Sequence, residues 1–320
     1  MTGTPVACRG DVTARVKTGT AAWADRSLVE SGFYPAHVRS PEAKLRYYAS
    51  QFPIVENDST YWAFPDAERV RTWAERSPDG FTMNIKAHAL LTQHYASARG
   101  LPRDIRERLS PELLARPHLY PKDLGPKLMR ELTHRFRDAL APLAQAGKLG
   151  VVLFQFPVWF PISSARKADL RRIRDSFHDF RVAIELRNET WMSQDNRYET
   201  LEFLADEGLI YVCVDEPQGF VASIPPVVAA TTDLAVVRMH GRNPARWRAR
   251  SHGRRTGGWP YRYSHDELVD WAARVRALAA RTEEVHVIFS NGPLDNAVRN
   301  ARELAELLEA PHAELGAPAP

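Results

Sequence analysis

The stretch Arg181-Val-Ala-Ile-Glu-Leu-Arg187 is short and apolar at alternate positions, which is the pattern of a β-strand. Seven other stretches are similarly short and rich in β-branched or aromatic residues, and helical periodicity fills most of the intervals between them. The eight predicted strands are residues 16–23, 53–57, 81–86, 149–156, 181–187, 210–215, 235–240 and 285–291. Eight strands that alternate with helices indicate an α/β fold, a parallel sheet closed into a TIM-type (β/α)8 barrel.

Three segments depart from this regular alternation. Residues 88–123 form a polar, proline-punctuated insertion after the third strand, and residues 241–263 form a long basic loop after the seventh. Residues 216–230 contain too many prolines to leave room for a full helix. We expect residues 15–310 to form a single barrel domain, with a flexible N-terminus at 1–14 and a flexible tail at 311–320.

Composition excludes several classes of protein. The chain has 320 residues, of which 44% are hydrophobic and 26% charged, as in globular proteins. No run of 18 apolar residues predicts a membrane span, and no apolar segment near the N-terminus predicts a secretory signal. Two cysteines, Cys8 and Cys213, are too few for a disulfide framework or a four-cysteine zinc site. We therefore expect a cytoplasmic protein, and the net charge of +4 permits an anionic partner without requiring one.

Strand alternation predicts which polar side chains face the inside of the barrel. In residues 181–187 the apolar positions should pack under the helices, which directs Glu185 and Arg187 into the bore. The second strand is ambiguous, because either Glu56 or Asn57 can face inward. The inward polar residues predicted in this way are Glu56, Lys86, Gln155, Glu185, Arg187, Asp215, Arg238 and His240.

These residues all lie near the C-terminal ends of their strands, where barrel enzymes carry their active sites. A purely structural bore would be filled by valine, isoleucine and leucine at this level. The alternative interpretation is an ion-pair network of Glu185, Arg187, Asp215 and Arg238 that holds the barrel together.

Several motifs resemble those of a known family. They include Thr18-Gly-Thr-Ala-Ala-Trp23, Val55-Glu-Asn-Asp-Ser-Thr-Tyr61, Phe154-Gln-Phe-Pro157, Ala183-Ile-Glu-Leu-Arg-Asn188, Val237-Arg-Met-His-Gly-Arg-Asn243 and Phe289-Ser-Asn291. Through them the chain resembles the DUF72 family (YecE-like proteins), which implies a TIM-type barrel but no particular reaction. Ala21-Ala22-Trp23 departs from the usual Ser-Gly-Trp, and Ser290 stands where an asparagine is common. The second departure favours Asn291 as the functional amide.

The leading hypothesis is an enzyme that binds an anionic, phosphate-bearing or sugar-like ligand at the C-terminal mouth of the barrel. It would act on this ligand by metal-free acid/base chemistry. Lys86, Arg187 and Arg238 would bind the anion, and His240 with Glu185 would transfer protons. The predicted catalytic residues are His240, Glu185, Glu56 and Asp215. The predicted ligand-binding residues are Lys86, Gln155, Arg187, Arg238, Asn291, Trp191 and Tyr61. No cofactor is predicted.

A divalent metal is the first alternative, and it would make the protein a phosphodiesterase or nuclease-like hydrolase. Its ligands would be Glu56, Glu185, Asp215 and His240. Lys86, Arg187 and Arg238 already balance the charge of the three carboxylates, so the site needs no metal for neutrality.

The second alternative is a non-catalytic nucleic-acid-binding protein that uses the basic loop. Residues 241–263 contain no acidic residue, and aromatic side chains are interleaved with the arginines. This composition suits a phosphate backbone with stacked bases. A lid over a small phosphorylated ligand and a solvated loop are the other interpretations. The arginines are Arg242, Arg246, Arg248, Arg250, Arg254, Arg255 and Arg262.

Overall fold

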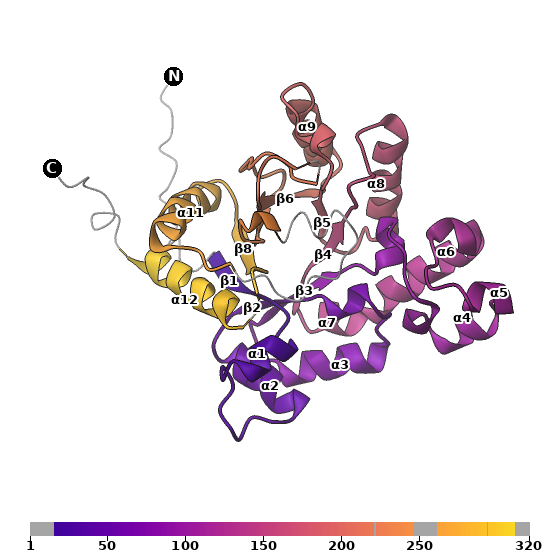
Figure 1. Cartoon of the computed structure of the whole chain (residues 1–320), viewed down its shortest axis with the longest axis horizontal. Coiled ribbons are helices and arrows are strands. Elements are labelled where there is room, and N and C mark those ends of the chain that lie inside the picture. Colours follow the sequence, from indigo (N-terminus) through magenta and orange to yellow (C-terminus); the bar gives the residue numbers. More distant parts are fainter. Residues whose placement is uncertain (1–15, 221, 246–260, 293, 311–320) are drawn as a thin grey trace.

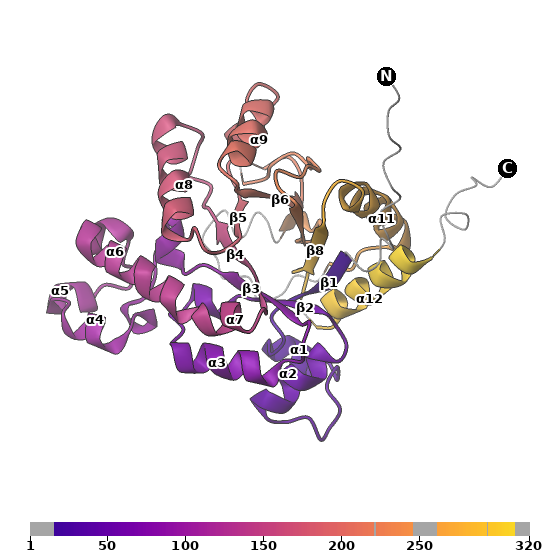
Figure 2. The same cartoon turned by 180° about the vertical axis from the view of Figure 1, so that it is seen from behind.

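A closed barrel of eight parallel strands, in chain order, forms the centre of the computed structural model (Figures 1 and 2). The structure describes residues 16–220, 222–245, 261–292 and 294–310. The strands are β1 (Val16–Ala21), β2 (Ile54–Asn57), β3 (Thr82–Lys86), β4 (Leu149–Gln155), β5 (Val182–Glu185), β6 (Ile210–Asp215), β7 (Leu234–Met239) and β8 (Glu284–Phe289). β8 pairs with β1 and closes the barrel, so the predicted (β/α)8 architecture is confirmed.

Helices surround the barrel and cover the outer faces of the strands (Figure 1). Ser264 and Glu267 form a capping box, and Ser40 caps a helix that has Pro41 in its first turn. The helices are α1 (Arg26–Glu30), α2 (Pro41–Ala49), α3 (Ala67–Arg76), α4 (Arg103–Glu107), α5 (Pro111–Leu114), α6 (Pro121–Ala139), α7 (Ala141–Gln145), α8 (Ser164–Ser176), α9 (Arg197–Asp206), α11 (His265–Ala279) and α12 (Asn296–Glu309).

The insertion after β3 folds around an apolar cluster of its own. Its short helices are η3 (Ala89–Thr92), η4 (Ala98–Gly100), α4 and α5, of which α4 and α5 lie with α6 to one side of the barrel (Figure 1). Leu90, Leu101, Ile105 and Leu119 are buried in this second cluster. The backbone N–H of Phe64 donates to the carbonyl of Gly100 at 3.0 Å, so the insertion supports the loop that follows β2.

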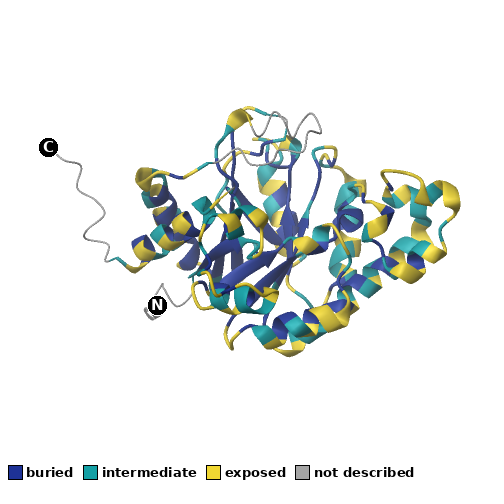
Figure 3. Cartoon of the chain, turned by 60° about the horizontal axis from the view of Figure 1, so that its bottom comes forward, coloured by how far each residue is buried: buried dark blue, intermediate teal, exposed yellow. Residues whose placement is uncertain are grey.

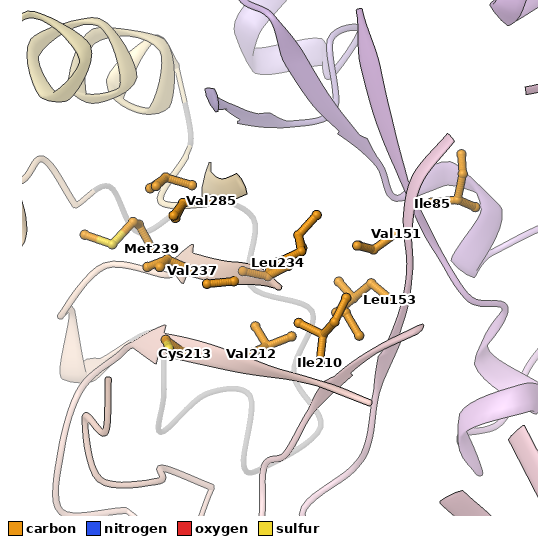
Figure 4. Close-up of a cluster of buried hydrophobic side chains, with 14 of the residues drawn as sticks. Ile85, Val151, Leu153, Ile210, Val212, Cys213, Leu234, Val237, Met239 and Val285 are labelled. Carbon is orange, nitrogen blue, oxygen red and sulfur yellow. The ribbon is translucent and has the colours of Figure 1, made fainter. Parts of the chain in front are cut away.

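Apolar side chains fill much of the barrel beneath its C-terminal end, and most residues of the strands are buried (Figure 3). Figure 4 shows this layer, in which residues of β4, β6 and β7 gather inside the barrel. The inner residues labelled there are Val151, Leu153, Ile210, Val212 and Leu234. The polar residues at the C-terminal mouth lie directly above this apolar layer.

Some predictions fall outside the described part of the chain. These include the flexible termini at 1–14 and 311–320 and most of the basic loop, including Arg246, Arg248, Arg250, Arg254 and Arg255. Within the described residues between β6 and β7 no helix is present, as the prolines predicted. Among the helices that the structure describes, none combines the length and apolar character that crossing a membrane requires.

Candidate functional site

Glu185, the last residue of β5, is the centre of a buried ion-pair network at the mouth. Its carboxylate accepts from the guanidinium groups of Arg187 and Arg238. Gln155 Nε2 donates to Glu185 Oε1 at 2.7 Å. Burial opposes ionisation of Glu185, but the charges of Arg187 and Arg238 outweigh it and hold the pKa of Glu185 well below its usual range. Glu185 is therefore an anion fixed in position by its neighbours.

Arg238, on β7, joins Glu185 to a second buried carboxylate. Its Nε and Nη2 atoms lie 3.0 and 2.6 Å from Oε2 and Oε1 of Glu56, a bidentate pair. Glu56, rather than Asn57, thus faces the bore, which resolves the ambiguity of the second strand. Burial raises the pKa of Glu56, and the charges of Arg238 and Lys86 only partly offset this effect. Arg238 is almost fully buried, and its guanidinium is committed to carboxylates.

Arg187 extends the network to a residue that strand alternation did not identify. Its Nη1 donates to Glu216 Oε2 at 2.5 Å, and Glu216 is buried immediately after β6. The second oxygen of Glu216 accepts from the backbone N–H of Ile224 at 2.8 Å, which fixes the following loop. A weak signal was available in the sequence, because Val212, Val214 and Glu216 share one parity.

His240 lies between the carboxylate centre and a hydroxyl group. Its Nε2 is 3.0 Å from Glu185 Oε1 and 2.7 Å from Arg187 Nη2, while its Nδ1 is 2.7 Å from Ser290 Oγ. Burial and the charge of Arg187 lower the pKa of His240 well below its usual value, so the ring is neutral near pH 7. Because the Ser290 hydroxyl can donate or accept, it matches either tautomer of the ring. This arrangement suits proton transfer at the mouth.

Lys86 lies at the solvent side of the network and is half-buried. Its ammonium donates to Gln155 Oε1 at 2.9 Å and lies 4.5 Å from the centre of the Tyr61 ring. Burial and the charge of Arg238 lower the pKa of Lys86 to about 8, against the opposing effect of Glu56. Within the described part of the chain, no carboxylate oxygen lies within 4.0 Å of Lys86 Nζ.

An aromatic strip borders Lys86. The Tyr61 ring contacts Trp62 and His94 edge-to-face, with ring centres 4.9 and 5.6 Å apart, and His94 contacts Trp159 at 5.7 Å. Trp62 is 67% exposed and Trp159 is 51% exposed. Exposed indoles beside a polar site suit stacking against a sugar or a base. Sequence reasoning did not identify His94 or Trp159 as members of this strip.

Three predicted site residues lie away from the network, and Asp215 is the first. β6 pairs with β7 so that Val214 lies beside Arg238 and Asp215 beside Met239. Residues paired in register in a parallel sheet project to the same face, so Asp215 faces the helices, contrary to the prediction. There it binds Arg242 at 3.0 Å. β6 is apolar on both faces, so alternation could not decide its orientation.

Asn291 and Trp191 are the other two. Asn291 Nδ2 donates to the Tyr261 carbonyl and to Asn300 Oδ1, both at 2.9 Å, so this amide binds α12 while Ser290 reaches the mouth. The sequence favoured Asn291 as the functional amide, but the side chain that contacts His240 is that of Ser290, one position earlier. Trp191 is fully buried, stacks on Phe160 and donates to the Phe160 carbonyl at 2.7 Å, so its ring lies in the core and is not exposed to a ligand.

The four residues proposed as metal ligands do not converge, because Asp215 lies on the outer face and Arg238 binds both oxygens of Glu56. Among the described residues, no group of three or more His, Cys, Asp or Glu side chains is arranged to hold a metal ion. Arg242, the first arginine of the basic loop, pairs with Asp215 and Glu267. At the mouth the described residues offer a cation, Lys86, and a carboxylate, an imidazole and a hydroxyl in contact with one another, Glu185, His240 and Ser290.

Comparisons with known proteins agree with this architecture. The chain is 32% identical over 294 residues to the UPF0759 protein YunF of Bacillus subtilis (strain 168). The aligned residues cover 91% of this chain and 94% of the relative. It is similar to a DUF72 family protein of Thermotoga maritima MSB8 (TM-score 0.71, 27% identity, covering 92% and 100% of the two chains). A DUF72 family protein of Enterococcus faecalis V583 gives a TM-score of 0.70 with 26% identity, covering 93% and 96%. The family model for the protein of unknown function DUF72 matches residues 17–320, and the chain belongs to this family.

Proposed function

We propose that this protein is an enzyme that binds a small anionic ligand, phosphate-bearing or sugar-like, at the C-terminal mouth of its barrel. Acid/base chemistry without a metal would then act on the ligand. The observation that carries the proposal is the position of Lys86, a half-buried cation beside the network with no carboxylate partner among the described residues. A half-buried cation that no carboxylate contacts directly is stabilised when a ligand places a negative charge against it.

Because Arg187 and Arg238 are paired with carboxylates, we give them a different role from that of Lys86. Arg238 binds Glu56 and Glu185, and Arg187 binds Glu185 and Glu216. Their role in this proposal is to hold Glu185 ionised beside His240. The direct contact with an anionic group then falls mainly to Lys86.

His240 would exchange protons with the ligand. A neutral imidazole can accept a proton, and the adjacent Glu185 carboxylate would stabilise the imidazolium that results. Ser290 would hold the other ring nitrogen in position. The exposed faces of Trp62 and Trp159 would contact the ring of a sugar, which connects the strip to the same ligand.

Replacement of Lys86 by methionine tests this proposal. We expect ribose 5-phosphate to bind the wild-type protein more tightly than ribose, and Lys86→Met to weaken that binding at least about tenfold, because a charge-assisted contact is worth roughly 1.5–3 kcal/mol. Lys86→Arg should retain most of the binding. Isothermal titration calorimetry measures the affinity, and thermal unfolding confirms that the variants are folded.

Lys122 supplies a matched control. Its ammonium also lies over a tyrosine ring, 5.9 Å from the centre of Tyr120, but it is exposed and outside the network. Lys122→Met should therefore leave the affinity for ribose 5-phosphate unchanged. Equal affinity of wild-type and Lys86→Met protein for the phosphorylated sugar would refute the proposed role of Lys86.

A further inference from the structure

We infer that the amine of Lys86 is a nucleophile that forms an imine with the carbonyl group of an anionic aldehyde or ketone. The inference rests on the proposed function and names the substrate class of the same site. It is carried by the contacts of the lysine, by the residue type chosen at this position and by the charges that face it.

The contacts of Lys86 differ from those of the other buried lysine. Lys148 Nζ donates to the carbonyls of Ala74 and Ser77, both at 2.7 Å, so two backbone acceptors hold this nitrogen in place. Lys86 Nζ makes one such hydrogen bond, to the amide oxygen of Gln155. Gln155 is itself fixed by its bond to Glu185, so it orients the nitrogen without supplying a negative charge. A single neutral acceptor leaves the nitrogen lone pair accessible once a proton is lost.

The residue type also distinguishes this position. The chain contains 36 arginines and only seven lysines, and the other two cations of the network are arginines. A guanidinium stays protonated in proteins, whereas a lysine ammonium can release its proton and react. An arginine at position 86 would provide the same positive charge for anion binding. The lysine therefore offers a chemistry that the arginines of this site cannot.

The charges around Lys86 make the amine accessible near neutral pH. The charged and titratable groups that face it are Glu56, Asp58, Tyr61, His94, Glu185 and Arg238. Burial and Arg238 together outweigh the carboxylates, and the pKa of Lys86 falls to about 8. At pH 7 about one tenth of such a lysine is amine, compared with about one part in 3,000 for a lysine of ordinary pKa.

The step is balanced by one proton from solvent. The lone pair of Lys86 Nζ attacks the carbonyl carbon, and the electron pair of the C=O π bond moves to oxygen. The oxygen takes the second N–H proton and the solvent proton and leaves as water, so the products are a protonated imine and water. The positive charge stays where the ammonium was, in the field of Glu56 and Glu185. An anionic group on the same substrate adds to this neutralisation.

Reductive trapping tests the inference. The protein is incubated with glyoxylate and sodium cyanoborohydride at pH 7, and the modified lysines are quantified by peptide mass spectrometry. We expect Lys86 to be carboxymethylated at least about tenfold faster than the exposed Lys122, because burial and Arg238 enlarge the amine fraction of Lys86. The rate at Lys86 should rise with a midpoint near pH 8. Lys86→Arg should remove the label at this position, and Lys122→Arg should leave it unchanged.

Two further arms separate this inference from the proposed function. Equal labelling rates at Lys86 and Lys122 would overturn the imine, and binding of ribose 5-phosphate would still support the anion site. Preferential labelling of Lys86 by acetaldehyde, without acceleration by the carboxylate of glyoxylate, would overturn the anionic part of the substrate class. Protection of Lys86 by ribose 5-phosphate, together with fast trapping by glyoxylate, supports both.

Discussion

Replacement of Arg238 by methionine is expected to lower the free energy of unfolding by about 3 to 5 kcal/mol, because it leaves the buried carboxylate of Glu56 without its arginine and removes one of the two arginines that bind Glu185. Arg238 binds both oxygens of Glu56 and one oxygen of Glu185, and all three side chains are almost fully buried. Methionine has a similar length, so the loss of packing is small. Urea denaturation at pH 7 measures the change.

Two controls make the cause of this loss clear. Arg103, which is 85% exposed and pairs with Glu107 on the surface, should tolerate the same substitution with little change. Glu56→Gln introduced into the Arg238→Met protein should recover part of the stability, because it removes the buried charge that lost its arginine. Equal losses for Arg238→Met and Arg103→Met would show that the network contributes little.

The same reasoning changes what is expected of Arg187. If Arg187 only bound the anion, as the sequence predicts, Arg187→Ala would abolish ligand binding and leave the fold intact. In the structure Arg187 binds two buried carboxylates, Glu185 and Glu216, so the substitution should also destabilise the protein. Ligand binding is therefore better tested with a substitution of Lys86. Among the described residues, no carboxylate loses an ion-pair partner when Lys86 is replaced.

Acidification from pH 6.5 to pH 5 is expected to cost about 2 kcal/mol of stability through His88 alone, at about 1.4 kcal/mol per pH unit. Burial lowers the pKa of His88 to about 3, and the ring is inaccessible to solvent. The unfolded chain binds a proton at this histidine below pH 6.5, whereas the folded chain does not. The contribution of neutral His88 to the free energy of unfolding is therefore present above pH 6.5 and is lost as the pH falls toward 3. Burial and Arg187 lower the pKa of His240 in the same direction.

His88→Asn isolates this effect. His88 Nδ1 accepts from the backbone N–H of Leu90 at the start of η3, and an asparagine oxygen can take that cap. The variant should be less stable at pH 7, because its side chain is smaller, but it should lose less stability between pH 6.5 and pH 5. Urea denaturation at a series of pH values gives both quantities. Parallel pH profiles for the two proteins would contradict the assignment to His88.

The sequence by itself determined the barrel. Eight short strands, each separated by enough chain for a helix, have few other arrangements in a parallel sheet, and the structure confirms all eight. It also determined that ionisable residues meet at the mouth. Strands β5 and β7 carry a polar residue at every second position near their ends, so alternation correctly placed Glu185, Arg238 and His240 inside the barrel, where they meet.

Only the tertiary structure decided which faces of β6 and of the end of β8 turn inward. Both faces of a strand in a closed parallel barrel are buried, one by the bore and one by helices, so hydrophobic alternation is lost where neither face is polar. The register with β7 then selects Glu216 over Asp215, and the hydrogen bond to His240 selects Ser290 over Asn291. The central pair of the network, Arg238 with Glu56, joins residues 182 positions apart. Such a contact depends on closure of the whole barrel, which no local pattern in the sequence records.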